Sequence, residues 1–295
     1  MPDSPLVSAR RGALPILTAA MLWGTTGTAS TFAPAGAPPA AIGSAGLVLG
    51  GLLLFFTSRG TAPVTAFIHS ERWLLALGAL TVAGYPLTFY PAVARAGVAV
   101  ATVVALGSAP VFAGLLGWLT GQGRPGLRWA GATLASVAGC SLLVAGPLLA
   151  GHGRAAPVSA LGIVLAALSG LSYAAYSLTG GKLIARGHGA SRVLGAMFGA
   201  GSLLVLPVLL AGDTHWLVTV RGAVVAMHLA IFTTFLAYRL FGRGLRSIDA
   251  RVATTLTLAE PAVATVLGVV VLGEHLPTVS WAGIAVLAVG LAMLL

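Results

Sequence analysis

The chain has 295 residues, of which 58% are hydrophobic and only 7% are charged. Its mean hydropathy is +0.99, and a water-soluble protein of this length needs far more polar surface than such a composition supplies. The composition therefore excludes an ordinary soluble enzyme or binding domain. It indicates an integral membrane protein with a net charge of +10.

Apolar runs of about 20 residues recur along the whole chain, and each is long enough to cross a hydrocarbon core of roughly 30 Å. Continuous apolar runs predict helices rather than the alternating strands of a barrel. We therefore predict an all-α polytopic membrane protein with ten transmembrane helices. They fall near residues 12–32, 40–57, 73–93, 97–120, 127–150, 158–179, 193–212, 222–242, 252–272 and 278–295.

The basic residues divide unevenly between the two sides of this ten-helix arrangement. With a cytoplasmic N-terminus, thirteen of the 16 Lys and Arg residues fall on the inner side, and only Arg95, Arg154 and Arg221 fall outside. Such an excess is the positive-inside bias of membrane proteins. It predicts that both termini are cytoplasmic, and it explains the positive net charge without a nucleic-acid partner.

The second half of the chain repeats the first at an offset of 152 residues. Because five spans per unit is an odd number, the two units must face opposite ways across the membrane. We predict one unit at residues 1–151 and an inverted second unit at 152–295, together forming one transmembrane domain, as in many secondary transporters. The matched pairs include Gly121 with Gly273, Pro125 with Pro277, Trp129 with Trp281 and Gly131 with Gly283.

Polar and aromatic side chains at helical spacing mark helix faces that turn away from lipid. In the sixth span, Tyr173 and Tyr176 continue a stripe that begins at Ser169. Trp23 lies near the middle of the first span, where the interfacial anchoring that explains the other tryptophans does not apply. From such patterns we predict that the substrate-binding residues are Trp23, Thr26, Tyr85, Phe89, Tyr173, Tyr176, His228 and Glu260.

The third span contains Pro86 and Pro91, and each proline frees one backbone carbonyl. Two interpretations stay open: a bent helix that lines a cavity, or a kink whose carbonyls bond to neighbouring helices.

The eighth span carries a helical stripe of His228, Phe232, Phe235 and Arg239. His228 either binds substrate or moves protons, or it is a hydrogen-bonded packing residue. Arg239 lies near the inner end of its span and is expected to be a topology charge.

Glu260 is the one carboxylate well inside a predicted span, and Pro261 follows it directly. Proline removes its own amide donor and disfavours helical angles at the preceding residue, so we expect a distorted backbone here. An ionised carboxylate in lipid is costly, so Glu260 must be protonated, paired or hydrated. Three roles remain open: a proton-coupling group, a site for a substrate ammonium, or a structural brace.

The sequence offers little for other chemistry. Cys140 is the single cysteine, so no intramolecular disulfide forms. No metal-ligand spacing, nucleophile elbow or P-loop occurs, and we predict no cofactor, no metal and no enzymatic activity.

Glycine spacings predict close helix packing within a monomer rather than dimerisation; they join Gly46 to Gly50, Gly117 to Gly121 and Gly195 to Gly199.

The segment 256–261 (LTLAEP), followed by 272–276 (LGEHL), resembles a signature of the EamA family in the drug/metabolite transporter superfamily. Weaker forms occur in the first unit at 107–110 and at 20–24. There Ala109 replaces the acidic residue of the signature, and Gln122 replaces its glutamate. The first unit therefore departs from the family pattern where the second unit follows it.

This resemblance implies a ten-helix bundle in a bacterial inner membrane, with a central cavity that exports amino acids or other small metabolites by alternating access. The aromatic side chains predicted for the site favour relatives of the YddG type, which export aromatic amino acids. The alternatives are a drug or nucleotide-sugar carrier of the same superfamily, or a channel or membrane scaffold. The lack of a basic cluster at the midplane argues against a highly anionic substrate.

Overall fold

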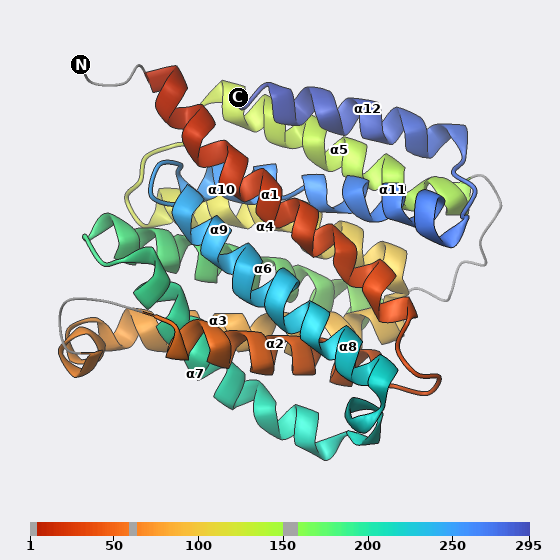
Figure 1. Cartoon of the computed structure of the whole chain (residues 1–295). Helices are drawn as coiled ribbons and strands as arrows, with labels where there is room; N and C mark the ends of the chain where they lie inside the picture. Colours follow the sequence, from red (N-terminus) through yellow and green to blue (C-terminus); the bar gives the residue numbers. More distant parts are fainter. Residues whose placement is uncertain (1–4, 59–63, 150–158) are drawn as a thin grey trace.

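The structure, a computed structural model, describes residues 5–58, 64–149 and 159–295, and within these ranges every regular element is a helix (Figure 1). The predicted all-α class is confirmed. The elements are α1 (Pro5–Thr31), α2 (Pro39–Phe56), α3 (Val64–Ala96), α4 (Val98–Leu119), α5 (Leu127–Leu149), α6 (Ala160–Ala185), α7 (Ala190–Ala211), η1 (His215–Val218), α8 (Val220–His228), η2 (Leu229–Leu236), α9 (Ala237–Gly244), α10 (Ala250–Leu256), α11 (Ala259–Leu272) and α12 (Thr278–Ala292).

Within the described ranges, eight helices are long and apolar enough to cross a membrane. Two of these spans are composite: α8, η2 and α9 make one, and α10 with α11 makes the other. The helix α12 is apolar but has only 15 residues, and α1 has 27 residues with several threonines. Each predicted span thus falls on a helical segment of a polytopic membrane protein. The predicted boundary between residues 151 and 152 lies outside the described residues.

The helix contacts follow a two-fold pattern that relates the two units. Helix α2 packs against its counterpart α7, and α5 packs against its counterpart α12. Helices α3 and α4 pack on α6, just as the equivalent η2–α9 and α11 pack on α1. Figure 1 shows that α1 begins and α12 ends at the same end of the bundle. Two groups result, the α3–α4–α6 group and the α1–α9–α11 group, and they face each other.

Small residues let the helices approach closely, as the glycine spacings predicted. A Cβ added to Gly46 would lie 2.8 Å from Leu229 of η2, and one added to Gly199 would lie 2.7 Å from Phe55 of α2. The prediction fails for the pair that ends at Gly121. This glycine follows the end of α4 with φ +86°, and a Cβ added to it would meet no atom within 4 Å, so it serves the turn rather than a helix contact.

Helix α3 keeps helical backbone angles at Pro86 and Pro91, where the sequence predicts a bend or a kink. The non-helical angles inside α3 occur instead at Glu71 (φ −117°, ψ 19°). Arg186 and His188, in the connection between α6 and α7, donate hydrogen bonds to the Glu71 carboxylate over 2.5 and 3.1 Å. Glu71 lies near the start of α3, so these angles do not affect the part of the helix that contains the two prolines.

Candidate functional site

A cavity of about 520 Å³ lies between the α3–α4–α6 group and the α1–α9–α11 group. Its size suits a small organic ligand, since such sites span roughly 300–1,000 Å³. Seven of the eight residues that the sequence predicts for the site line this cavity. They are Trp23, Thr26, Tyr85, Phe89, Tyr173, Tyr176 and Glu260.

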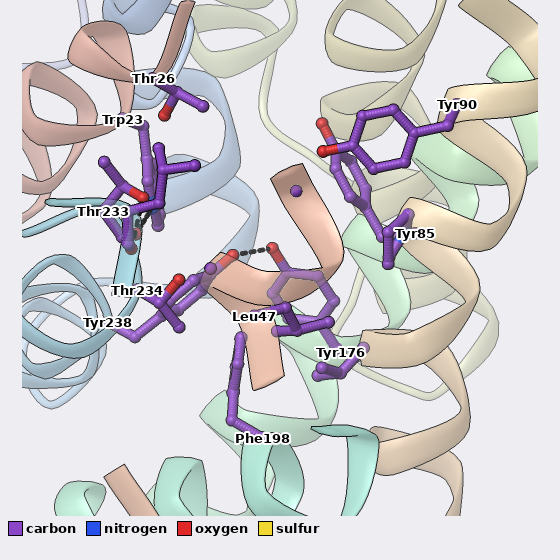
Figure 2. A pocket seen from close by; sticks show the side chains of 15 residues that line it. Trp23, Thr26, Leu47, Tyr85, Tyr90, Tyr176, Phe198, Thr233, Thr234 and Tyr238 are labelled. Atoms are coloured by element: carbon purple, nitrogen blue, oxygen red, sulfur yellow. Dashed lines mark hydrogen bonds between the residues drawn. The ribbon is translucent and has the colours of Figure 1, made fainter. Parts of the chain in front are cut away.

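A smaller cavity of about 130 Å³ adjoins the first on the side of α2 and α7. In Figure 2, Trp23 and Thr233 lie on one side of this space and Tyr85 and Tyr90 on the other. The two cavities share six lining residues and differ in the rest. The shared residues are Trp23, Thr26, Tyr85, Tyr90, Tyr176 and Tyr238; the apolar residues found only in the smaller cavity are Leu47, Val82, Pro86, Phe198 and Leu229.

Trp23 occupies the centre of the site and ties α1 to η2. Its indole Nε1 donates a buried hydrogen bond of 2.8 Å to the carbonyl of Thr233 (Figure 2). Its ring also contacts Tyr238 and Tyr173, with centroid distances of 5.0 and 6.4 Å. The bonded carbonyl belongs to a π-helix, a form that often marks functional sites because it disturbs the regular hydrogen-bond ladder.

Two tyrosine hydroxyls of α6 join the two helix groups. Tyr173 donates a buried hydrogen bond of 2.7 Å to Oγ1 of Thr257, between α10 and α11. The hydroxyls of Tyr176 and Tyr238 are 2.8 Å apart and share a hydrogen bond (Figure 2). Since both bonds cross between the groups beside the cavity, they hold the groups together in this conformation.

Glu260 lies in the first turn of α11, directly after a break in the ninth span. The helix stops at Leu256 and resumes at Ala259, and the Glu260 amide donates to the Thr257 carbonyl over 3.0 Å. The distortion predicted beside Pro261 is therefore confirmed. The Glu260 carboxyl faces the larger cavity and makes no hydrogen bond or ion pair with any residue that the structure describes.

The larger cavity reaches one end of the bundle. Its lining includes Val98 at the start of α4, Val144 near the end of α5, and Glu274 and Leu276 between α11 and α12. These positions share one end of the bundle, because α4 begins there and α5 and α11 end there. Toward the other end, α1 packs on α9 around Ile16, which is fully buried. The cavity is thus open at one end and closed at the other.

His228 lies outside the lining of both cavities. Its Nε2 is 2.9 Å from the Thr25 hydroxyl, and its ring packs on Phe232 with a centroid distance of 5.1 Å. The predicted stripe through Phe232 turns away from the site, since Phe232 is 43% exposed. The π-helix Leu229–Leu236 explains this, because it changes the 3.6-residue spacing on which the stripe was based.

Several lining residues were not predicted from the sequence, and two of them, Thr234 and Tyr238, lie on or just after this π-helix. Tyr238 lines both cavities, as does Tyr90, and Thr234 lines the smaller one. Tyr90 comes five residues after Tyr85, a spacing outside the search for one helical face. Glu274 also lines the larger cavity, and its place in the 272–276 signature was the available signal.

A polytopic bundle of two similar helical units around a central cavity is an architecture of secondary membrane transporters. The chain belongs to the EamA-like transporter family, whose family model matches it twice, at residues 10–145 and 160–295. The predicted duplication and the family resemblance are thereby confirmed.

Individual relatives agree with this assignment. The chain is 36% identical to the "uncharacterized transporter YwfM" of Bacillus subtilis, over 95% of this chain and 92% of the relative. It is 27% identical to the "uncharacterized inner membrane transporter YicL" of Salmonella typhimurium, over 94% and 92%. A solved crystal structure, 22% identical, matches 96% of both chains with a TM-score of 0.75; that likeness supports the fold.

Proposed function

We propose that this chain is a secondary transporter that exports small amphipathic metabolites, amino acids and related amines, by alternating access through the central cavity. The observation that carries the proposal is a cavity between two helix groups whose lining, among the described residues, reaches one end of the bundle. In such a carrier, the site faces one side at a time, and the groups rock about it. The proposed site residues are the seven predicted residues that line the cavity.

The proposed topology places both termini in the cytoplasm of a bacterial cell with the chain in its inner membrane, following the positive-inside bias. The described conformation then faces outward, since the cavity reaches the end opposite the start of α1. The two units, residues 1–151 and 152–295, act as one domain in a monomer. To reload from inside, the hydrogen bonds of Tyr173 and Tyr176 must open.

Glu260 is the residue to which we assign coupling. A structural brace needs bonded partners, and among the described residues its carboxyl has none. A carboxylate in the first turn of a helix is stabilised by the helix dipole, and a cavity admits protons, water and substrate to it. We therefore propose that a proton and the substrate ammonium occupy this carboxylate in turn, which yields exchange.

The test is flux of radiolabelled amino acids and amines in proteoliposomes under an imposed pH gradient. Wild-type protein should accelerate uptake against empty liposomes, with saturation and counterflow. Glu260→Gln should abolish the response to the gradient. The matched control Asp213→Asn, an exposed carboxylate outside the spans, should leave flux unchanged. A complete panel without flux above empty liposomes would refute transport, and unsaturable flux would indicate a channel.

A further inference from the structure

The charge of the site is unbalanced. Among the described residues that line the two cavities are two carboxylates, Glu260 and Glu274, and no lysine, arginine or histidine. The basic residues behind the net charge of +10 fall mainly on the two sides of the predicted spans, and none of them lines these cavities. An amino-acid substrate would find a partner for its ammonium group here but no cation for its carboxylate.

Two helices begin beside the larger cavity, α11 next to Glu260 and α4 at Val98, and neither brings a basic side chain to the lining. The N-terminus of α11 presents the positive end of a helix dipole, but its first turn already carries Glu260. A substrate carboxylate brought to the same amides would meet a like charge at close range in a medium of low dielectric constant, and such an arrangement is unfavourable.

Several lining hydroxyls are also committed within the protein. Tyr173 donates to Thr257, Thr265 donates to the carbonyl of Pro261 over 2.8 Å, and Thr233 donates to the carbonyl of Leu229 over 2.8 Å. These groups can still accept hydrogen bonds, which suits an ammonium donor and does not suit a carboxylate.

Aromatic rings favour a cation in the same space. The faces of Trp and Tyr attract ammonium groups, and clusters of such rings form the sites that recognise organic cations. The smaller cavity, which adjoins the larger one and has several apolar lining residues, offers space for the apolar part of a ligand. The aromatic lining residues of the two cavities are Trp23, Tyr85, Phe89, Tyr90, Tyr173, Tyr176, Phe198 and Tyr238.

We infer that the site prefers amphipathic organic cations, amines with an apolar or aromatic body and no free carboxylate, over zwitterionic amino acids. This inference rests on the proposed function and narrows its substrate class. The ammonium lies at Glu260 among the aromatic rings, and the apolar body extends toward Leu47 and Phe198 of the smaller cavity.

The experiment uses four ligands that share a phenyl ring and differ in charge: phenethylamine, phenylalaninamide, phenylalanine and 3-phenylpropionate. Their dissociation constants for the purified full-length protein in detergent are measured by calorimetry at neutral pH. We expect the two amines to bind about tenfold more tightly than phenylalanine, because burying an unpaired charged group is costly, and phenylpropionate to bind most weakly. Equal or tighter binding of phenylalanine overturns the inference, as does failure of all four to bind.

Variants separate the role of the charge from that of the fold. Glu260→Gln should weaken amine binding about tenfold and so erase the preference, while Glu260→Asp should retain the ranking and Asp213→Asn should match wild type. Retention of the amine preference in Glu260→Gln protein that elutes as a folded monomer overturns the assignment. Because binding is measured without flux, the outcomes are distinct. A preserved ranking without transport refutes the carrier alone, and transport with no amine preference refutes this inference alone.

Discussion

The fourth span of the first unit and its counterpart in the second unit share a proline but differ in shape. Helix α4 runs unbroken through Ala109 and Pro110, both buried, whereas the equivalent span divides into α10 and α11 just before Glu260 and Pro261. Proline alone therefore does not break a helix in this molecule. The break occurs where the span faces the cavity and where Tyr173 of α6 bonds to Thr257 between the two halves.

The third spans of the two units show the same contrast. Helix α3 carries two prolines and keeps helical angles at both, while its counterpart contains no proline and includes the π-helix η2. The irregular backbone is again the part that lines a cavity and bonds to a side chain, here Trp23. Irregular backbone at membrane depth is tolerated where protein or a cavity satisfies it, and in this chain the second unit supplies it.

Exchanging the acidic residue between the two positions that directly precede the shared proline should have the largest effect. Ala109→Glu places a carboxyl at a fully buried position, and we expect a loss of roughly 3–5 kcal/mol of stability, as for an unpaired buried charge. Glu260→Ala should leave the folded yield in detergent unchanged but reduce proteoliposome flux by about 30-fold or more. Size-exclusion profiles and flux measure the two effects. Folded, active Ala109→Glu protein would contradict the distinction between the units.

The equivalent glycines Gly131 and Gly283 should differ in their tolerance of alanine. A Cβ on Gly283 would lie 2.5 Å from the Leu143 amide nitrogen and 2.8 Å from the Gly139 carbonyl oxygen, both backbone atoms. We expect Gly283→Ala to cost about 1–3 kcal/mol through overpacking of α12 on α5. The Cβ on Gly131 meets only Met293 at 3.8 Å, so Gly131→Ala should not destabilise. Thermal unfolding in detergent measures both, and equal shifts would refute the asymmetry.

Trp23 and Tyr173 lie at the same distance from the starts of the two family matches, residues 10 and 160, but their bonds differ. Trp23→Phe leaves the buried Thr233 carbonyl without its donor and should cost roughly 1–3 kcal/mol of stability. Tyr173→Phe keeps the ring and removes one bond between the helix groups, so it should favour opening at the closed end. Thiol labelling of Ala13→Cys, a position that is 2% exposed at the closed end, should rise about threefold with Tyr173→Phe in a Cys140→Ser background. Unchanged labelling would show that this hydrogen bond does not keep the closed end of the cavity shut.

The smallest effect is expected at the paired prolines. Pro110→Ala restores an amide within a continuous helix and should change flux less than twofold, because a backbone already helical gains one bond. Pro261→Ala lets the new amide bond toward Thr257 and straighten the break, which we expect to lower flux about threefold. Initial rates in proteoliposomes, at equal amounts of folded protein, compare the two. A larger effect at Pro110 would contradict the functional meaning of the break.

The sequence predicted seven of the residues that line the larger cavity, because the relevant signals are local. Tyr173 and Tyr176 share a helical face, and Glu260 next to Pro261 indicates a charge beside a distorted backbone. Tyr173, Tyr176 and Glu260 all line the larger cavity. His228 did not, and Tyr238 was missed, because the spacing between them crosses a π-helix. No local pattern marks that helix, and one of its carbonyls accepts a hydrogen bond from Trp23, which lies 210 residues away in the chain.

The sequence alone determined which segments enter the lipid bilayer and which stay in water. Composition, apolar run length and charge placement define a membrane chain of two similar units, because the free energy of transfer into lipid is set residue by residue along a helix. Tertiary structure decided which end the cavity reaches, which helices break, and that the lining among the described residues combines carboxylates and aromatic rings with no basic side chain. Those features depend on the positions of helices far apart in the chain, and only packing brings them together.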